Sequence, residues 1–308
     1  MPHAVPCAMQ AFESGVEESL GVGAVGKVGV LSLSLARIGA TTRVRRQFQR
    51  APLQIYQPVY LDPGRPDMAF LYLLQAGDGL VQGDRYRVDI SCESDAAVHV
   101  TTLSTTNVFA ARQNYASQLV NLDVGPGAVL EYLPDPVVPF RGSRFFQQTS
   151  AVVDQSATVI FGETLVPGRI ARHEIHAYDA FIAETVVRRQ DGTEIFSDTL
   201  SIVPAQGDDP ESLGLLGPAP VVASLYMISE QADSAILVRE LRAGLNEASD
   251  VFIGVSELPN RAGAVVRILG PTSRAVKSAR LTAWHAGRMV LLGVPPPYLR
   301  KGDQYPMV

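Results

Sequence analysis

The sequence predicts a mainly β fold: a stacked, β-helix-like domain of many strands with two α-helices in its C-terminal region. Apolar and polar residues alternate in short runs from Arg43 to about Val203, and this period of two indicates strands. The 308 residues include 26 Gly and 21 Pro spread along the chain, which would interrupt a helical bundle every few turns. A unit of turn, alanine and strand also recurs within the β-rich half.

The recurring unit predicts stacking. Its three copies place Ala97, Ala128 and Ala157 at a spacing of about thirty residues. Such a period is typical of stacked β architectures, in which each unit buries its face on the next, while a run of similar hairpins in a sandwich is the alternative. Stacking would bring the residues that follow each repeat strand to one end of the stack. These residues are 103–107, 134–136 and 162–164.

Short alternating runs locate individual strands. Examples are 86–90, 98–101, 119–124 and 185–188, each bounded by turn residues. A hairpin is expected at Gln190–Thr193, because the Asp191-Gly192 pair accepts the positive φ angles of a tight turn. The segment around His173 and His176 also has the pattern of a strand. These two side chains would then point to opposite faces, as surface histidines rather than metal ligands.

The last third of the chain predicts two helices. The first is expected near 231–247, with Asp233 or Ser234 as its N-cap and leucines on one stripe. The second is expected near 272–292, where Gly293 and the following prolines end it.

Two further strands are expected between these helices, at 251–255 and 263–269. The predicted organisation is a single β-rich domain over 36–300. A loosely ordered N-terminal arm over 1–35 precedes it, and a C-terminal tail over 301–308 follows it.

Composition excludes several classes of protein. Hydrophobic residues make up 46% and charged residues 19%, unlike a disordered chain. The net charge of −5 gives no electrostatic reason to expect nucleic acid, and no segment has the pattern of a membrane span or a secretory signal. Two cysteines, Cys7 and Cys92, cannot build a disulfide framework or a four-sulfur metal site, so a reducing cytoplasmic location is expected.

The small net charge conceals segregation of charge along the chain. Residues 19–61 contain six Lys or Arg and no acid, and residues 258–302 contain eight and no acid. Residues 207–257 contain nine acids against two arginines. Two interpretations remain open: ordinary solvated faces, or sided surfaces whose complementary potentials orient partner proteins.

The search for catalytic chemistry finds no nucleophile motif, since the chain has no Gly-x-Ser-x-Gly elbow. The glycine-rich segment Gly77–Asp84 lacks the Lys-Ser/Thr ending of a phosphate loop, so it is expected to be a backbone turn between two strands. What remains is a set of carboxylates in apolar or proline-rich surroundings, namely Glu131, Asp135 and Glu163. An ionised carboxylate there is costly unless it is paired, hydrogen-bonded or beside water or a cation.

These carboxylates have two interpretations. In the first, arginines nearby in the sequence neutralise them: Arg141, Arg144 and Arg169. In the second, they line a polar interior together with the hydroxyl groups that stacking would place beside them: Ser104, Thr105 and Thr106.

Five motifs resemble one known family. They are Gly77–Asp84, Thr101–Ala110, Leu130–Asp135, Phe140–Arg144 and the segment from Gly162-Glu163 to Gly168-Arg169. In order and spacing they resemble the urease accessory protein UreD family, also called UreH. A late apolar run followed by a basic helix continues the match, which covers roughly 43–292.

The resemblance implies a non-catalytic scaffold and conduit. With the accessory protein UreF and the GTPase UreG it would deliver nickel to apo-urease, as part of a 2:2:2 accessory complex in the cytoplasm. It would have no tightly bound cofactor, nickel only in transit, and neither nucleic acid nor membrane as a partner. The resemblance points first to Glu163, then to Glu131 and Asp135, as transient nickel ligands. The residues implied to line the passage are Ser104, Thr105 and Thr106.

The scarcity of strong nickel ligands fits this role. Imidazole and thiolate hold nickel tightly, whereas carboxylates, hydroxyls and water bind it more weakly and permit movement. A chain with five His and two Cys therefore suits a conduit better than a storage protein. Two alternatives remain: a β-solenoid or sandwich enzyme acting on a polysaccharide, and a metal-free scaffold that binds partners through its charged faces.

Overall fold

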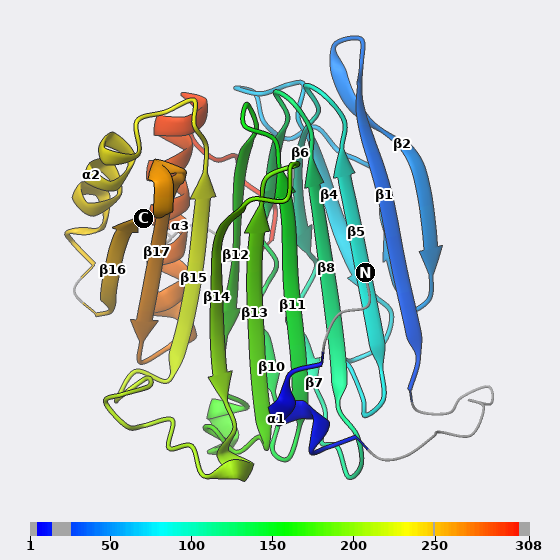
Figure 1. Ribbon diagram of the computed structural model, residues 1–308, viewed down its shortest axis with the longest axis vertical. Helices are drawn as coiled ribbons and strands as arrows, with labels where there is room; N and C mark the ends of the chain where they lie inside the picture. The colour runs from blue at the N-terminus through cyan, green and yellow to red at the C-terminus, as the bar shows by residue number, and fades with distance from the viewer. Residues whose placement is uncertain (1–4, 14–25, 249, 302–308) are drawn as a thin grey trace.

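Two β-sheets lie face to face in the computed structural model, which describes residues 5–13, 26–248 and 250–301 (Figure 1). Within these residues, seven strands form sheet A: β1 (Val28–Ile38), β2 (Thr41–Arg50), β5 (Arg85–Cys92), β8 (Ala116–Val124), β11 (Arg144–Val153), β13 (Ala180–Arg188) and β14 (Glu194–Ile202). Ten strands of the same described part form sheet B: β3 (Leu53–Ile55), β4 (Ala69–Gln75), β6 (Ala97–Thr102), β7 (Thr106–Val108), β9 (Val129–Tyr132), β10 (Val137–Pro139), β12 (Thr158–Leu165), β15 (Val221–Ile228), β16 (Phe252–Glu257) and β17 (Gly263–Gly270).

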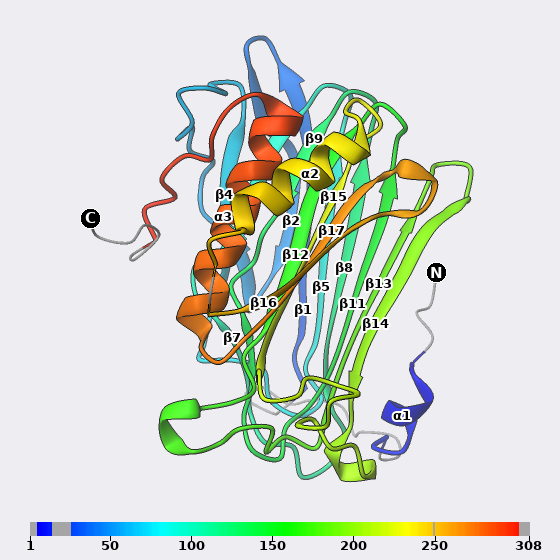
Figure 2. The same cartoon turned by 90° about the vertical axis from the view of Figure 1, so that its left-hand side faces the viewer.

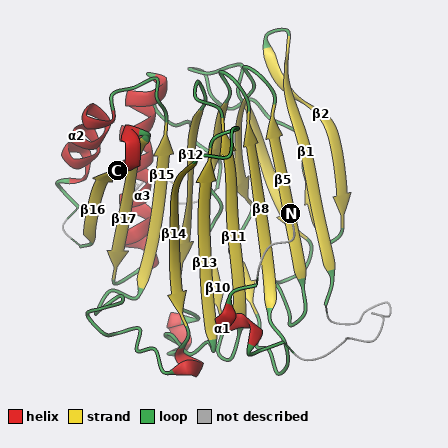
Figure 3. Ribbon diagram, viewed as in Figure 1, coloured by secondary structure: helices red, strands yellow, loops and turns green. Residues whose placement is uncertain are grey.

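The chain winds through the two sheets as a β-solenoid of about four turns. Strands β5, β8, β11 and β13 pair in parallel in sheet A, and β4, β6, β9 and β12 do so in sheet B. Strands β7 and β10 form a short third ladder beside them. The predicted mainly β, stacked fold with two late helices is therefore confirmed, and strands fill the centre of the molecule in Figure 3.

The repeat that predicted this stacking is present, but its first copy is shifted by one residue. Val129 pairs with Ala97, so the equivalent of Ala128 is Ala96 rather than Ala97. Ala96, Ala128 and Ala157 are all buried, and each amide bonds a carbonyl three residues earlier. The sequence carries two consecutive alanines in the first copy, and the pattern alone could not choose between them.

Alternation decides which side chains enter the core between the sheets. Inward residues of both sheets form one large apolar cluster there. A second cluster lies between sheet B and two helices, α2 (Ser234–Leu245) and α3 (Ser273–Leu292), which cover the outer face of sheet B in Figure 2. The predicted caps are present, since Asp233 accepts hydrogen bonds from the first turn of α2 and Gly293 ends α3 with a φ of 70°.

The other predicted elements of the chain's second half also form. The hairpin at Gln190–Thr193 joins β13 and β14, with Gly192 at a φ of 91°. Strands β16 and β17 occupy the two runs predicted between the helices. The segment at 169–176 differs from its predicted strand, because it forms a loop around a short 3₁₀ turn (Ile170–Arg172) in which His173 and His176 have positive φ.

The β structure starts earlier than the predicted boundary at residue 36. Strand β1 begins at Val28, within the range predicted as an arm, because alternate leucines at 31, 33 and 35 enter the inter-sheet core. A short helix, α1 (Cys7–Gln10), buries Met9 on the outer face of sheet A. Residues 1–4 and 14–25 of the predicted arm, and 302–308 of the predicted tail, lie outside the described residues. Among the described residues, no helix is long and apolar enough to cross a membrane.

Candidate functional site

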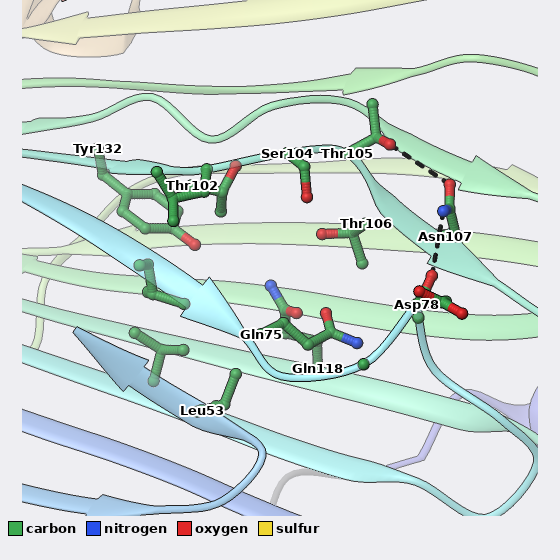
Figure 4. A pocket seen from close by; sticks show the side chains of 15 residues that line it. Leu53, Gln75, Asp78, Thr102, Ser104, Thr105, Thr106, Asn107, Gln118 and Tyr132 are labelled. Carbon is green, nitrogen blue, oxygen red and sulfur yellow. Dashed lines mark hydrogen bonds between the residues drawn. The ribbon is translucent and has the colours of Figure 1, made fainter. Parts of the chain in front are cut away.

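A cavity of about 310 Å³ lies between the sheets on the side of β3, β4 and β7, and it is lined mainly by polar side chains (Figure 4). The three hydroxyl residues predicted to line a polar interior border it: Ser104, Thr105 and Thr106. Other polar side chains of its wall are Gln75, Thr102, Asn107, Gln118 and Tyr132. We call this space the entry cavity.

The glycine-rich segment forms part of the entry cavity. As predicted, it is a turn between two strands, β4 and β5. Gly79 has a φ of 154°, and a Cβ atom there would lie 2.3 Å from the backbone oxygen of Asn107. Only glycine allows this approach. The amide of Asn107 in turn donates a hydrogen bond of 3.1 Å to the backbone oxygen of Asp78, which ties the turn to the third ladder.

Beyond the entry cavity, polar residues form a row across each sheet. In sheet A, Gln118 pairs in register with Gln147 on the next strand. In sheet B, Glu163 pairs in register with Ser224, which pairs with Arg267. Register partners point to the same face of a sheet, and these rows face the interior.

The two rows meet at Glu163. The Nε2 amide of Gln147 donates a hydrogen bond of 3.0 Å to Oε2 of Glu163, so the contact joins sheet A to sheet B. Both residues border a small cavity of about 10 Å³, whose other walls include Phe181 and Leu200. Glu163 keeps partial exposure in this position, whereas its neighbours on β12 are buried.

The surroundings of Glu163 favour its protonated form. Burial raises the pKa of Glu163 to about 7, and the negative charge of Asp198 adds to the effect against the opposing influence of Arg267 and Gln147. A carboxyl group with this pKa is partly protonated near neutral pH. A carboxyl group whose pKa is shifted this far marks a candidate functional position.

Asp198 marks the far end of the row. It accepts a hydrogen bond of 2.6 Å from the hydroxyl of Tyr226 and an ion pair from Arg267. All three residues border an open cavity of about 400 Å³ between β14 and β15–β17, which we call the exit cavity. The polar row thus runs across the strands, with a larger cavity at each end and Glu163 between them.

Glu131 lies elsewhere, on the outer face of sheet B. Its carboxylate is 2.7 Å from Nδ1 of His99, accepts a bond of 3.2 Å from the indole of Trp284, and is 3.1 Å from Nε of Arg288. The Glu131 and Arg288 side chains are 0% exposed, and Arg288 also pairs with Asp62 at 2.6 Å. Helix α3 seals this cluster from solvent.

Opposing effects set the charge states in this cluster. Burial acts to raise the pKa of Glu131, but His99, Arg288 and Trp284 outweigh it and hold the pKa below its usual value. Burial lowers the pKa of His99 despite the nearby carboxylate. A neutral His99 donates from Nδ1 to Glu131, which leaves Nε2 as an acceptor that has no hydrogen-bond partner among the described residues.

Asp135 lies at the end of sheet B, apart from both other acids. It accepts a hydrogen bond of 3.0 Å from Thr102 and pairs with Lys301 at 2.6 Å. The prediction that the three acids gather is therefore wrong. Glu131 points away from the space between the sheets, whereas Glu163 points into it, and Asp135 lies beyond the end of β9. Two of the three arginines considered as their partners pair elsewhere: Arg144 with Asp179, and Arg169 with Glu174.

Sequence reasoning missed Gln118, Gln147, Asp198 and Arg267. The signal was present in part, because each is a polar residue at an inward position of a strand whose other inward residues are mostly apolar. Within the residues that the structure describes, no group of three or more His, Cys, Asp or Glu side chains is placed to hold a metal ion. Along the row between the sheets, the oxygen atoms that could bind a cation belong to the carboxylates of Glu163 and Asp198 and to the amide and hydroxyl groups around them.

Comparison with known proteins identifies a consistent set of relatives. The family model of the UreD urease accessory protein matches residues 27–302. Urease accessory protein UreD 2 of Streptomyces griseus subsp. griseus is 39% identical over 293 residues, covering 94% of this chain and 98% of that protein. Urease accessory protein UreD of Cenarchaeum symbiosum is 32% identical over 284 residues, covering 92% and 99%. Urease accessory protein UreD 2 of Brucella suis biovar 1 is 32% identical over 282 residues, covering 91% and 93%.

Proposed function

The chain belongs to the UreD urease accessory protein family and serves urease maturation without catalysis of its own, and we propose that it acts as a scaffold with an internal nickel conduit. The conduit runs from the entry cavity past Glu163 to the exit cavity. The observation that carries this proposal is the 3.0 Å contact between Gln147 and Glu163, which joins the polar rows of the two sheets between two larger cavities.

The chemistry of the row suits transit rather than storage. Hydroxyl, amide and carboxylate oxygens bind a divalent ion more weakly than imidazole or thiolate, so the ion can leave each position. Glu163 supplies a negative charge when nickel displaces its proton, which its pKa of about 7 makes easy. The Arg267 charge repels a cation, but its pairing with Asp198 reduces this barrier at the exit.

The assembly follows from the same proposal. UreF, the GTPase UreG and apo-urease are the proposed partners, in a 2:2:2 accessory complex in the cytoplasm. Each cavity mouth would face a different partner, so that nickel passes between proteins without release to solvent. Of the three acids considered as ligands, the proposal retains Glu163 and sets Glu131 and Asp135 aside, because cations of the chain already neutralise those two.

The test is urease activation in nickel-limited cells that carry Glu163→Gln. We expect the variant to fold and form its complex with partners, but to reduce urease activation at limiting nickel. The matched control is Glu184→Gln. Glu184 accepts an equivalent bond of 2.9 Å from Gln148, but from strands β13 and β11 on the outer face of sheet A.

The outcomes separate the conduit from a metal-free scaffold. Reduced activation by Glu163→Gln that excess nickel restores, with a normal Glu184→Gln control, supports the conduit. Normal urease activation by Glu163→Gln at every nickel level would contradict the proposed role of Glu163 and favour a scaffold that only binds partners. Loss of complex formation by Glu163→Gln alone would mean that the contact between the two sheets supports the scaffold rather than a nickel conduit.

A further inference from the structure

A second polar site lies on the other side of sheet B, in a pocket of about 50 Å³ between the sheet and α3. Three cations line it: Lys277 and Arg280 on α3, and Lys301 on the segment that follows. Asp135 is the one carboxylate in its wall, so the lining carries an excess of two positive charges. The inter-sheet row described above does not border this pocket.

The three cations are incompletely neutralised. Lys301 uses its ammonium on Asp135 at 2.6 Å and on the hydroxyl of Thr101 at 3.1 Å. Arg280 donates only to a backbone carbonyl, that of Pro134 at 3.1 Å. Lys277 makes no hydrogen bond or ion pair with the residues that the structure describes. Burial lowers the pKa of Lys301, and the charges of Arg280 and Lys277 lower it further, against the opposing charge and hydrogen bond of Asp135.

The remaining walls are apolar and preformed. Leucines from sheet B, from α3 and from the last segment surround the cations, and the ring of Trp284 closes one side. Trp284 is held in place because its indole donates to the buried Glu131 and its ring packs against His99 and Arg288. A rigid wall of this kind lowers the entropic cost of binding a ligand.

Size and charge define the ligand class. A cavity needs about 10–15 Å³ to hold one water molecule. This pocket of about 50 Å³ therefore holds roughly four heavy atoms, the size of a carboxylate with its first carbon. A monoanion is repelled half as strongly as a dianion by the carboxylate of Asp135, and it still neutralises one of the two excess positive charges. We propose that this pocket binds a carboxylate group carried on an apolar stem, supplied by a small acid or by the end of a polypeptide.

The only tryptophan of the chain reports on this pocket directly. Trp284 is the single Trp, so intrinsic tryptophan fluorescence of the purified full-length protein monitors one site. We expect sodium hexanoate to change the emission saturably and hexanamide, which lacks the charge, to bind at least about tenfold more weakly. Inorganic phosphate lacks the apolar stem and should also bind more weakly than hexanoate.

Charge reversal distinguishes binding in the pocket from attraction of the anion by the overall electrostatic field of the protein. Lys277→Glu should weaken hexanoate binding about tenfold or more. Arg274→Glu is the matched control, because it makes the same change on an exposed residue of α3 that does not line the pocket. Equal effects of the two variants, equal binding of hexanamide, or phosphate binding as tightly as hexanoate would each overturn the proposal.

A second titration, with peptides, identifies the source of the carboxylate. An apolar tetrapeptide with a free C-terminus is compared with its C-terminal amide, in the same fluorescence titration. Tighter binding of the free peptide than of hexanoate assigns the pocket to a polypeptide end. Tighter binding of hexanoate assigns it to a small acid, and both results require that Lys277→Glu reduces the affinity.

Discussion

Gln147 of sheet A and Glu163 of sheet B meet across the interior of the protein, where Nε2 lies 3.0 Å from Oε2. This is a polar contact inside a space that leucines, valines and aromatic rings otherwise fill. A carboxyl group is hard to keep ionised there, which has measurable consequences for stability.

The first prediction concerns the pH dependence of stability. The folded pKa of Glu163 is about 7 against an ordinary value of 4.5, so the folded state binds more protons between these values and loses stability as pH rises through them. Glutamine cannot ionise. Glu163→Gln should therefore exceed the wild-type unfolding free energy by about 1–3 kcal/mol at pH 8 and equal it near pH 4. Denaturant unfolding at both pH values measures this, and an equal gain at both would contradict the assignment.

The second prediction concerns the origin of that pKa. Asp198 raises the pKa of Glu163 and Arg267 lowers it. Asp198→Asn removes the raising charge and frees Arg267, and both changes act in the same direction. When Glu163→Gln is made in Asp198→Asn protein, the pH at which its gain in unfolding free energy levels off should therefore be lower than in the wild-type background, and the gain at pH 8 should be smaller. An unchanged levelling-off pH would show that burial alone sets the pKa.

The third prediction explains why glycine precedes Glu163. A Cβ atom at Gly162 would lie 2.4 Å from the backbone oxygen of Ser224 on the neighbouring strand. Gly162→Ala should push β12 from β15 and cost about 2–4 kcal/mol of unfolding free energy. Gly254→Ala on β16 is the control, since nothing lies within 4 Å of its Cβ position and its effect should stay within about 0.5 kcal/mol. Similar unfolding midpoints for the two variants would refute the close approach.

The fourth prediction concerns the buried cluster beneath α3. Arg288 is 0% exposed and pairs with both Asp62 and Glu131. Arg288→Met leaves two buried carboxylates without their cation and should cost about 3–5 kcal/mol. Arg239→Met removes an exposed pair with Glu240 on α2 and should cost under about 1 kcal/mol. Thermal or denaturant unfolding compares them, and a small loss for Arg288→Met would mean that water enters the cluster.

Local patterns predicted the stacked strands because pairing in a solenoid joins residues about thirty positions apart. The turn and alanine recur in the sequence with the same period. The same logic placed Ser104, Thr105 and Thr106 at a cavity wall. The start of β1 could also have been recognised, because leucine and serine alternate from Leu31 to Leu35 as in any strand.

Local sequence patterns do not predict the partners of Glu131. Its neighbours Leu130 and Tyr132 enter the inter-sheet core, so Glu131 must face the other side, as strand parity alone would have indicated. What covers that side is a helix whose Trp284 lies 153 residues further along the chain. No local pattern indicates such a distant partner. The contact between Gln147 and Glu163 could not be predicted for the same reason, since it forms only when the two sheets pack together.

The seal over sheet B has a consequence for the order of synthesis. His99 and Glu131 are made in the first half of the chain, but the residues that shield them belong to α3, and Asp62 meets Arg288 only 226 residues later. A growing chain on the ribosome can stack its solenoid turns one by one, yet the charged face of sheet B stays open to water until α3 has been made. A nonsense mutation anywhere before the codon of Arg288 would therefore leave Asp62 and Glu131 without their buried cation, even in a chain whose solenoid turns are complete.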